Sequence, residues 1–321
     1  MPSGNCFQKL YSMTSKLYSM KKYLLPVISM CFLTGSLYAQ IIVDETDVRN
    51  GEGYYTTLQI AQNNATDVKT LDIQKREADD FLENKYSFPT LENVFIHFSE
   101  LNNFNSLKVN QNLKELRIMY SQNLKSLPDD ITDLPKLETI AVYSCGLQKL
   151  PATFFNNTNL KEVCLCYNRL HDLPEIAAGS NIKKLMLDIN SIDKLPPTFK
   201  NMKQLEVLGL RDCQFKTFPD EVLSLKKLKV LDLSANNISV LPDKISKLES
   251  LETLHLVRTG IRVLPASLRK SSLKYVAISD TGLTQAEKDN IIKSLPPDCQ
   301  INWSTNLNYS LYMSSCACLK L

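Results

Sequence analysis

The sequence lacks two features that would each point to a particular class of protein: a block of basic residues and an apolar run long enough to span a bilayer. Lys and Arg number 37 against 34 Asp and Glu, a formal net charge of +3. Residues 1–39 hold four lysines and no acid, so the rest of the chain has 33 basic and 34 acidic residues, a balance of −1. This mixed charge argues against nucleic acid as a partner. The 44% of hydrophobic residues is sufficient for a buried core.

The cysteines match neither a disulfide scaffold nor a metal site. Nine are present; removal of residues 1–39 would leave seven, an odd number that cannot pair completely. Cys316 and Cys318 form only half of a zinc site, and the sequence has no second pair with such spacing beyond the repeats. A phosphate-binding glycine loop is also absent. We therefore expect no metal and no other cofactor.

The first 39 residues have the features of a secretory signal. Lys21 and its neighbouring lysine precede an apolar run at residues 23–33, and small or neutral residues lead to Ala39. This pattern predicts cleavage after Ala39 and a mature chain in the periplasm, on the cell surface or in the medium. Met20 is the expected start, with residues 1–19 an upstream extension. A membrane anchor is the alternative, but the apolar run is too short to span a bilayer.

A repeat of 22 to 24 residues governs most of the chain. Ten segments align by a leading apolar residue, which we call position 1 of each copy. The clearest copy runs from Leu228 to Leu248 and reads LKVLDLSANNISVLPDKISKL. The position 1 residues are Val68, Leu91, Leu113, Leu137, Leu160, Ile182, Leu205, Leu228, Leu251 and Leu273.

Each copy contains a short strand followed by a turn with a recurring small or polar residue. Positions 4 and 6 are apolar and flank an outward residue, which is the period of a strand. One copy cannot bury its leucines alone, so stacked copies must form one continuous core. At position 9 the chain leaves the strand, and a side chain there can satisfy buried backbone groups of adjacent turns. We expect this structural ladder to consist of Cys145, Asn168, Asn190, Cys213, Asn236, Thr259 and Thr281.

An apolar residue followed by proline ends each inward turn and sets the return path of the chain. Proline fixes its own φ and removes an N–H that would have no partner at this point. A brief helical or 3₁₀ segment should follow each pair and bury one apolar side chain. The expected anchors are Ile131, Phe154, Phe199, Val222, Ile245 and Leu268.

These copies resemble the leucine-rich-repeat family pattern L-x-x-L-x-L-x-x-N-x-L, extended by L-P-x-x-I-x-x-L. The resemblance covers residues 54–303, and the L-P-x-x-I variant is similar to Ras-suppressor-type and plant disease-resistance-type repeats. It implies an α/β solenoid: a right-handed superhelix with a parallel concave sheet and short helical segments on the convex side. The variant is also common in bacterial secreted proteins. Animal extracellular arrays carry flanking cysteine clusters, which this chain lacks, so we expect a bacterial origin.

The repeats are expected to be closed by caps at both ends. We expect an N-terminal cap at residues 40–67, with a helix at residues 54–62, and the repeats at 68–283. A C-terminal cap at 284–303 should begin with a capping box of Thr284 and Glu287. Residues 304–321 lack the repeat period and are expected to be a disordered tail.

The concave face is the expected binding surface, because the family resemblance implies it and its N-terminal half is rich in aromatic and sulfur-containing residues. Exposed apolar area of this kind marks interaction sites, although the rings could instead only stack laterally to stabilise strands. The C-terminal half is charged, with Asp188 facing Arg211, Asp232 facing His255 and Arg258 facing Asp280. The predicted binding residues are Phe95, Phe98, Met119, Tyr120, Tyr143, Tyr167, Ile189, Arg211, Asp232, His255 and Arg258.

Three functions follow from this surface. The first is a non-enzymatic module that binds a protein or peptide, which the methionines beside the rings favour. The second is a glycan or cell-envelope binder, since aromatic rings can stack on sugars. The third is a small hydrolase that uses Asp232, His255 and Ser279 from successive strands. An open face without oxyanion donors disfavours the hydrolase.

Overall fold

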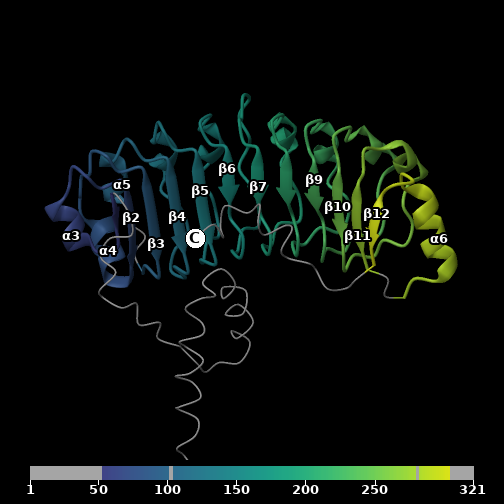
Figure 1. Cartoon of the computed structure of the whole chain (residues 1–321), viewed down its shortest axis with the longest axis horizontal. Coiled ribbons are helices and arrows are strands. Elements are labelled where there is room, and N and C mark those ends of the chain that lie inside the picture. Colours follow the sequence, from purple (N-terminus) through teal and green to yellow (C-terminus); the bar gives the residue numbers. More distant parts are fainter. Residues whose placement is uncertain (1–52, 101–103, 280–281, 304–321) are drawn as a thin grey trace, which may run out of the picture. The chain divides into compact units, whose positions relative to one another are not determined.

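Twelve parallel strands form one sheet in the computed structural model, which describes residues 53–100, 104–279 and 282–303. Each strand pairs with its neighbours in sequence, so the spatial order equals the chain order (Figure 1). The expected signal peptide and tail lie outside the described residues. The strands are β1 (Tyr54–Tyr55), β2 (Thr70–Gln74), β3 (Asn93–His97), β4 (Glu115–Met119), β5 (Thr139–Tyr143), β6 (Glu162–Cys164), β7 (Lys184–Met186), β8 (Val207–Gly209), β9 (Val230–Asp232), β10 (Thr253–Leu256), β11 (Tyr275–Ile278) and β12 (Gln300–Asn302).

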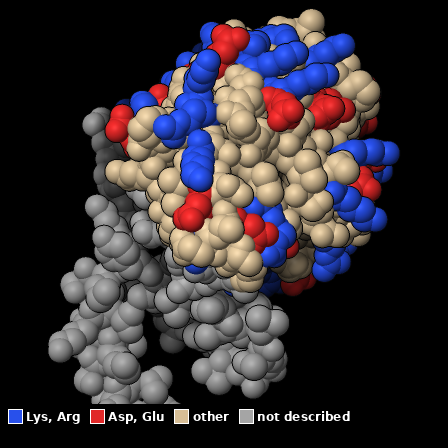
Figure 2. Space-filling view, turned by 90° about the vertical axis from the view of Figure 1, so that its right-hand side faces the viewer, with Lys and Arg blue, Asp and Glu red and all other residues tan. Residues whose placement is uncertain are grey.

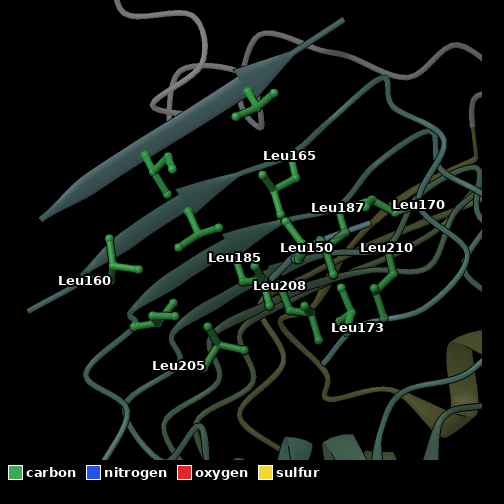
Figure 3. Close-up of a cluster of buried hydrophobic side chains, with 14 of the residues drawn as sticks. Leu150, Leu160, Leu165, Leu170, Leu173, Leu185, Leu187, Leu205, Leu208 and Leu210 are labelled. Atoms are coloured by element: carbon green, nitrogen blue, oxygen red, sulfur yellow. The ribbon is translucent and has the colours of Figure 1, made fainter. Parts of the chain in front are cut away.

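The repeat period sets the pairing register of this sheet. Leu185 on β7 pairs with Leu208 on β8, which pairs with Leu231 on β9. These position 4 leucines are fully buried, and Figure 3 shows such leucines from successive turns lying together. The opposite face of the sheet, which the sequence predicts to be concave, is called the outer face below. The architecture is the leucine-rich-repeat solenoid expected from the sequence.

Short 3₁₀ segments form the return path in six turns, and five of them directly follow a Pro residue. The prolines accept the first turn bond, as in Ile131 N–H to Pro128 O (3.1 Å) and Leu268 N–H to Pro265 O (3.0 Å). The six expected anchor side chains are all buried. The segments are η3 (Asp129–Asp133), η4 (Phe154–Asn156), η5 (Pro197–Asn201), η6 (Asp220–Ser224), η7 (Asp243–Lys247) and η8 (Ala266–Lys270).

The N-terminal turns depart from this pattern because they contain α-helices. The helix expected at residues 54–62 begins later, as α3 (Leu58–Asn63), and the two-residue strand β1 precedes it. Helix α4 (Lys75–Glu83) follows β2 directly, and no Leu-Pro pair intervenes. It buries Ala78, Phe81 and Leu82 at helical spacing. Helix α5 (Asn105–Val109) follows β3.

Position 9 side chains connect each turn to the previous one. Asn236 Nδ2 donates to the carbonyl of Leu210 at 2.7 Å, and its Oδ1 accepts the N–H of Phe215 at 3.1 Å. Asn168 and Asn190 make the equivalent bonds. These contacts satisfy buried backbone groups that would otherwise lack a partner.

The cysteine and threonine members of the ladder make fewer contacts. Cys145 Sγ lies 3.6 Å from Ile118 O, and Cys213 Sγ lies 3.5 Å from Leu187 O. Thr259 Oγ1 donates within its own turn, to Leu256 O at 2.8 Å. Thr281 lies outside the described residues.

Helix α6 (Gln285–Ser294) follows the last complete turn, and β12 closes the sheet after it. The expected capping box is present, because Thr284 Oγ1 accepts the N–H of Glu287 and Glu287 accepts the N–H of Thr284. Arg262 donates to Glu287 at 2.7 Å, and this bond, with those from Thr284, lowers the pKa of Glu287 to about 2. The first turn of α6 is therefore held by a reciprocal capping box and by an ion pair to Arg262.

Lateral ion pairs of opposite charge join successive turns at position 2. Basic and acidic side chains lie next to one another at the C-terminal end (Figure 2). Surface pairs of this kind contribute little individually. They are Glu92–Lys114 (2.8 Å), Glu138–Lys161 (2.7 Å), Glu206–Lys229 (2.7 Å) and Glu252–Lys274 (2.9 Å).

Candidate binding surface on the outer face of the sheet

A second apolar cluster lies on the outer face, separate from the leucine core. Its members come from positions 5 and 7 of consecutive turns, whose side chains point away from that core. Tyr120, Tyr167, Val207 and Val230 are partly buried and pack against it. The buried members, which we call the outer cluster, are Met119, Ala141, Tyr143, Cys164, Cys166 and Met186.

Four aromatic rings form a continuous run along one side of this cluster. Phe98 stacks on Tyr120 with ring centroids 5.2 Å apart. Tyr120 meets Tyr143 edge to face at 5.9 Å, and Tyr143 meets Tyr167 in a tilted arrangement at 5.0 Å. These distances are in the favourable range for aromatic pairs. The aromatic run therefore crosses four successive turns, from the end of β3 to the end of β6.

Three of the four rings are attached to residues with a left-handed backbone. Phe98, Tyr120 and Tyr167 have φ values of 56°, 58° and 57°, and position 8 has a positive φ in each of the turns from Phe98 to Arg258. In this conformation the position 8 N–H still donates to a carbonyl of the next turn, as the N–H of Tyr120 does to the carbonyl of Tyr143 at 3.0 Å. The chain can therefore turn away from the strand without losing this hydrogen bond. Glycine or asparagine would adopt this conformation with less strain. The chain carries an aromatic or large aliphatic side chain in four of these eight turns, among them Ile189 with φ 57°, and Ser, Asp, Ala or Arg in the other four.

The rings differ in exposure, which corrects the expectation that all of them face solvent. Phe98 is 46% exposed, whereas Tyr143 is only 7% exposed and belongs to the outer cluster. Tyr120 is intermediate, and burial is the main cause of its raised pKa. Tyr143 packs within the outer cluster and against the rings of Tyr120 and Tyr167, so it is a structural residue. Phe98, Tyr120 and Tyr167 are more accessible than Tyr143, and Phe98 is the most exposed of the four rings.

The sulfur atoms of this region fall into two groups. Cys145 and Cys213 are free, buried ladder thiols; burial raises the pKa of Cys145 to about 12 and also raises that of Cys213. Such thiols are unreactive near neutral pH. On the outer face, Cys164 is disulfide-bonded, while Cys166 is not in a disulfide and its Sγ lies 3.6 Å from that of Cys164. The sequence interpretation did not anticipate a disulfide at Cys164.

A polar group borders the outer cluster on β2 to β4. Arg117 is buried, lies over the ring of Phe95 at 4.9 Å and donates to Glu115 at 2.7 Å. His97 Nε2 lies 3.1 Å from Asp72 Oδ1. Because Phe95 packs beneath a guanidinium group, only part of its predicted binding surface is available.

The charged half of the outer face is more buried than its sequence indicates. Asp232 is paired in register with His255, and these residues are 2% and 9% exposed. Burial lowers the pKa of His255, and the nearby Asp232 carboxylate opposes this effect only in part. Asp188 is buried and accepts the backbone N–H of Arg211 at 2.8 Å. The predicted contact of Arg258 with Asp280 lies partly outside the described residues.

The strand register does not assemble the residues expected of a hydrolase. His255 pairs with Ala277, which places Ser279 two residues, or ~7 Å, further along the next strand. Ser279 Oγ accepts the backbone N–H of Arg258 at 2.9 Å. The geometry of these three side chains therefore gives no support for nucleophilic catalysis.

The structure also adds two residues to the ladder that the sequence interpretation missed. Ser121 Oγ accepts the N–H of Ser99 at 3.0 Å, and the N–H of Ser121 lies 3.4 Å from Cys145 Sγ. Ser99 Oγ in turn donates to Asp79 at 2.6 Å. Both serines occupy position 9, so the repeat alignment could have identified them. The ladder therefore begins two turns earlier than predicted.

Neither a metal site nor a membrane span occurs among the described residues. No group of three or more His, Cys, Asp and Glu side chains in residues 53–100, 104–279 and 282–303 could hold a metal ion. In the same ranges, every helix is too short or too polar to cross a bilayer. The outer face therefore offers apolar, aromatic and charged side chains rather than a metal centre.

Comparison with known proteins supports the leucine-rich-repeat fold that the parallel sheet and its repeated turns define. Residues 189–283 match the model of a leucine-rich repeat region. The chain is 30% identical over 155 residues to the volume-regulated anion channel subunit LRRC8D of Rattus norvegicus, covering 39% of this chain and 18% of the rat protein. It thus spans less than a fifth of that relative's length.

Solved structures share the fold. One is the ectodomain of the Arabidopsis thaliana membrane receptor kinase GASSHO1/SCHENGEN3 in complex with CASPARIAN STRIP INTEGRITY FACTOR 2, with 24% identity, a TM-score of 0.55 and coverage of 74% of this chain and 29% of that one. Another is a chain in the octameric complex of Latrophilin 3, Unc5D and FLRT2, with 18% identity, a TM-score of 0.55 and coverage of 74% and 83%. At these identities the similarity concerns the fold, which is that of a leucine-rich-repeat protein.

Proposed function

We propose that this protein is a non-enzymatic module that binds a peptide or protein segment on the outer face of its sheet, with Phe98 and Tyr120 as the principal contacts. The observation that carries this proposal is the aromatic run, which continues across four turns at 5.0–5.9 Å and ends in an exposed ring. Aromatic anchors beside apolar side chains are typical of protein interfaces.

The backbone at position 8 supports the same function. Left-handed conformations cost ~1–3 kcal/mol where the residue is not glycine. Every turn from Phe98 to Arg258 has this conformation at position 8, and at Phe98, Tyr120 and Tyr167 the side chain there is an aromatic ring outside the leucine core. A contact with a partner is a reason to place rings there.

The comparisons support a ligand of this class and an extracytoplasmic location. The plant ectodomain with the same fold belongs to a membrane receptor kinase and is in complex with an integrity factor. The signal at residues 1–39 is consistent with export. We further propose a bacterial origin, because cysteine clusters of the animal type do not flank the repeats.

A binding comparison tests this function. Mature chain, residues 40–321, is screened on a random peptide library and on a glycan array, and the Kd of a selected peptide is measured. The double variant Phe98→Ala with Tyr120→Ala should bind this peptide more weakly. The Kd should rise roughly 30-fold for each ring removed, which corresponds to ~2 kcal/mol per ring. The thermal midpoint should show that the variant remains folded.

The matched control removes two apolar side chains that are also exposed but lie elsewhere. Val240 and Val263 are 70% and 63% exposed, and their replacement by Ala should leave the Kd unchanged. Equal losses in both double variants would contradict a site on the aromatic run. Binding to glycans without any peptide hit would replace the proposed ligand class.

A further inference from the structure

We propose that the protein has a second binding surface along the 3₁₀ segments of its last turns, where a row of exposed basic side chains fits an acidic polysaccharide. This row, called the basic ridge below, follows the return path of the chain from η5 to η8. It lies apart from the outer face of the sheet and does not depend on the function proposed for that face. Its members, all of them exposed, are Lys200, Lys203, Lys226, Lys227, Lys247, Arg269 and Lys270.

Contacts between successive turns place these side chains in one row. Lys227 Nζ donates to Gln204 Oε1 at 2.6 Å, which joins the end of the turn that contains η6 to the end of the turn before it. Lys226 Nζ donates to the carbonyl of Lys247 at 2.7 Å, which continues the row to η7. Segments η7 and η8 pack against each other in the same way as η5 and η6 do. The basic ridge therefore crosses four successive turns.

The positive charge of the basic ridge is largely unbalanced. Of its seven cations, Lys226 alone forms an ion pair among the described residues, with Glu249 at 2.6 Å. The acidic side chains of η6 and η7 lie in the first turn of each segment, whereas the ridge residues lie at or after its end. Segments η5 and η8 have no acidic residue in their first turn. Cations that repel one another in this way favour a bound anion.

The fold does not require basic residues at this edge. In earlier turns the residue just before position 1 is Asn112, Asn159 or Asn181, and each donates to a carbonyl of the preceding turn at 2.6–2.8 Å. An uncharged amide therefore suffices to join the turns. The ridge lysines that form no ion pair or side-chain hydrogen bond with another described residue are Lys200, Lys203, Lys247 and Lys270. Their charges are available to a ligand.

The chemistry of the ridge suits an acidic polysaccharide better than a nucleic acid or a bilayer. Gln204 and Ser272 lie beside the cations and can bond sugar hydroxyls, while the cations pair with acidic groups that recur along the polymer. Single-stranded nucleic acid would need aromatic rings for stacking, and binding in a membrane interface would need apolar side chains. None of the exposed large apolar side chains among the described residues lies in η5 to η8; they are Phe98, Val109, Val240, Val263 and Ile292.

Binding of defined polymers to the mature chain tests the ridge. Polygalacturonate and dextran sulfate should bind, neutral dextran should not, and the Kd should rise with salt because exposed charges are screened. The ridge variant combines Lys200→Gln, Lys203→Gln, Lys247→Gln and Lys270→Gln. Its Kd for both polymers should rise on the order of tenfold, because a single exposed ion pair contributes little but four are removed together. Its thermal midpoint should equal that of the parent chain, since all four side chains are exposed.

The matched control removes the same charge from other parts of the surface. It combines Lys69→Gln, Lys85→Gln, Lys149→Gln and Lys194→Gln, all at exposed positions, and should keep the parent's Kd for both polymers. An equal loss in the two variants would mean that net charge rather than the ridge determines binding, and would overturn the proposal. Failure of the parent chain to bind either polymer would also overturn it, as would tighter binding to duplex DNA or to phosphatidylglycerol vesicles.

Lysine acetylation locates the contact without any substitution. In the parent chain, bound dextran sulfate should slow acetylation of Lys203, Lys247 and Lys270, measured by mass spectrometry, and leave the rates at Lys85 and Lys149 unchanged. Equal protection at all five lysines would contradict a site on the ridge. The ridge variant should retain the peptide Kd of the parent chain, so loss of peptide binding counts against the function of the outer face and loss of polysaccharide binding counts against the ridge.

Discussion

Asn236 illustrates how much of this fold depends on single polar side chains. It is 4% exposed, and its amide bonds the carbonyls of Leu210 and Leu233 and the N–H of Phe215. The Asn236→Leu variant leaves these backbone groups without partners, at a cost of ~1–3 kcal/mol each. We expect a clear fall in the free energy of unfolding, measured by urea denaturation.

The same repeat position provides the control for this prediction. Cys213 contacts carbonyls only at 3.5 and 3.8 Å, and Thr already occupies position 9 at Thr259. Cys213→Thr should therefore cost less than Asn236→Leu. Equal costs would show that volume rather than hydrogen bonding determines the ladder.

His255 makes the stability of the chain depend on pH. Burial lowers its pKa in the folded state below the ordinary 6.5. Below pH 6.5 this histidine takes up a proton in the unfolded chain, whereas buried His255 in the folded chain remains neutral to lower pH. The stability that follows from the lowered pKa is therefore fully present above pH 6.5 and is lost as the pH falls. The urea midpoint should decline from pH 7.5 to pH 5.5 in the parent chain and less steeply in His255→Gln. His171→Gln, at an exposed site, should retain the parent's slope; a shallower slope in that variant would contradict the assignment.

At the scale of elements, helix α6 depends on its first turn. Thr284 and Glu287 form a reciprocal capping box, and Arg262 binds the same carboxylate. Thr284→Ala should destabilise the helix by ~1 kcal/mol. Hydrogen exchange of the amides of residues 286–288 should accelerate, whereas Thr217→Ala at another exposed site should have no effect there. Unchanged exchange in α6 would mean that packing of Ile291, rather than the cap, holds the helix.

The elements also show where sequence reasoning succeeds and where it fails. The period of 22 to 24 residues predicted the strands and the proline-led 3₁₀ segments, and the capping box predicted the cap helix, because each depends on local pattern. It did not predict β1, whose two residues are too few to show a period. Nor did it predict α4 or α5, because neither helix follows the apolar–Pro pair that precedes most of the 3₁₀ segments.

For the candidate site, sequence identified the positions but not their burial. Alternation placed Tyr143 and Cys164 on the outer face, as the structure also does. The depth of a side chain on that face depends on what lies beside and above it, as the 7% exposure of Tyr143 and the bonded state of Cys164 show. Those contacts are not encoded in the period of any single copy.

At the scale of the whole molecule, strand order equals chain order, so each turn bonds only the turns on either side of it. Stability in such an array is a sum of units and the interfaces between them. Insertion or loss of one whole copy would therefore leave every other register intact. The length of the aromatic run, and hence the length of ligand that it could contact, could change in steps of one strand spacing without redesign of the core.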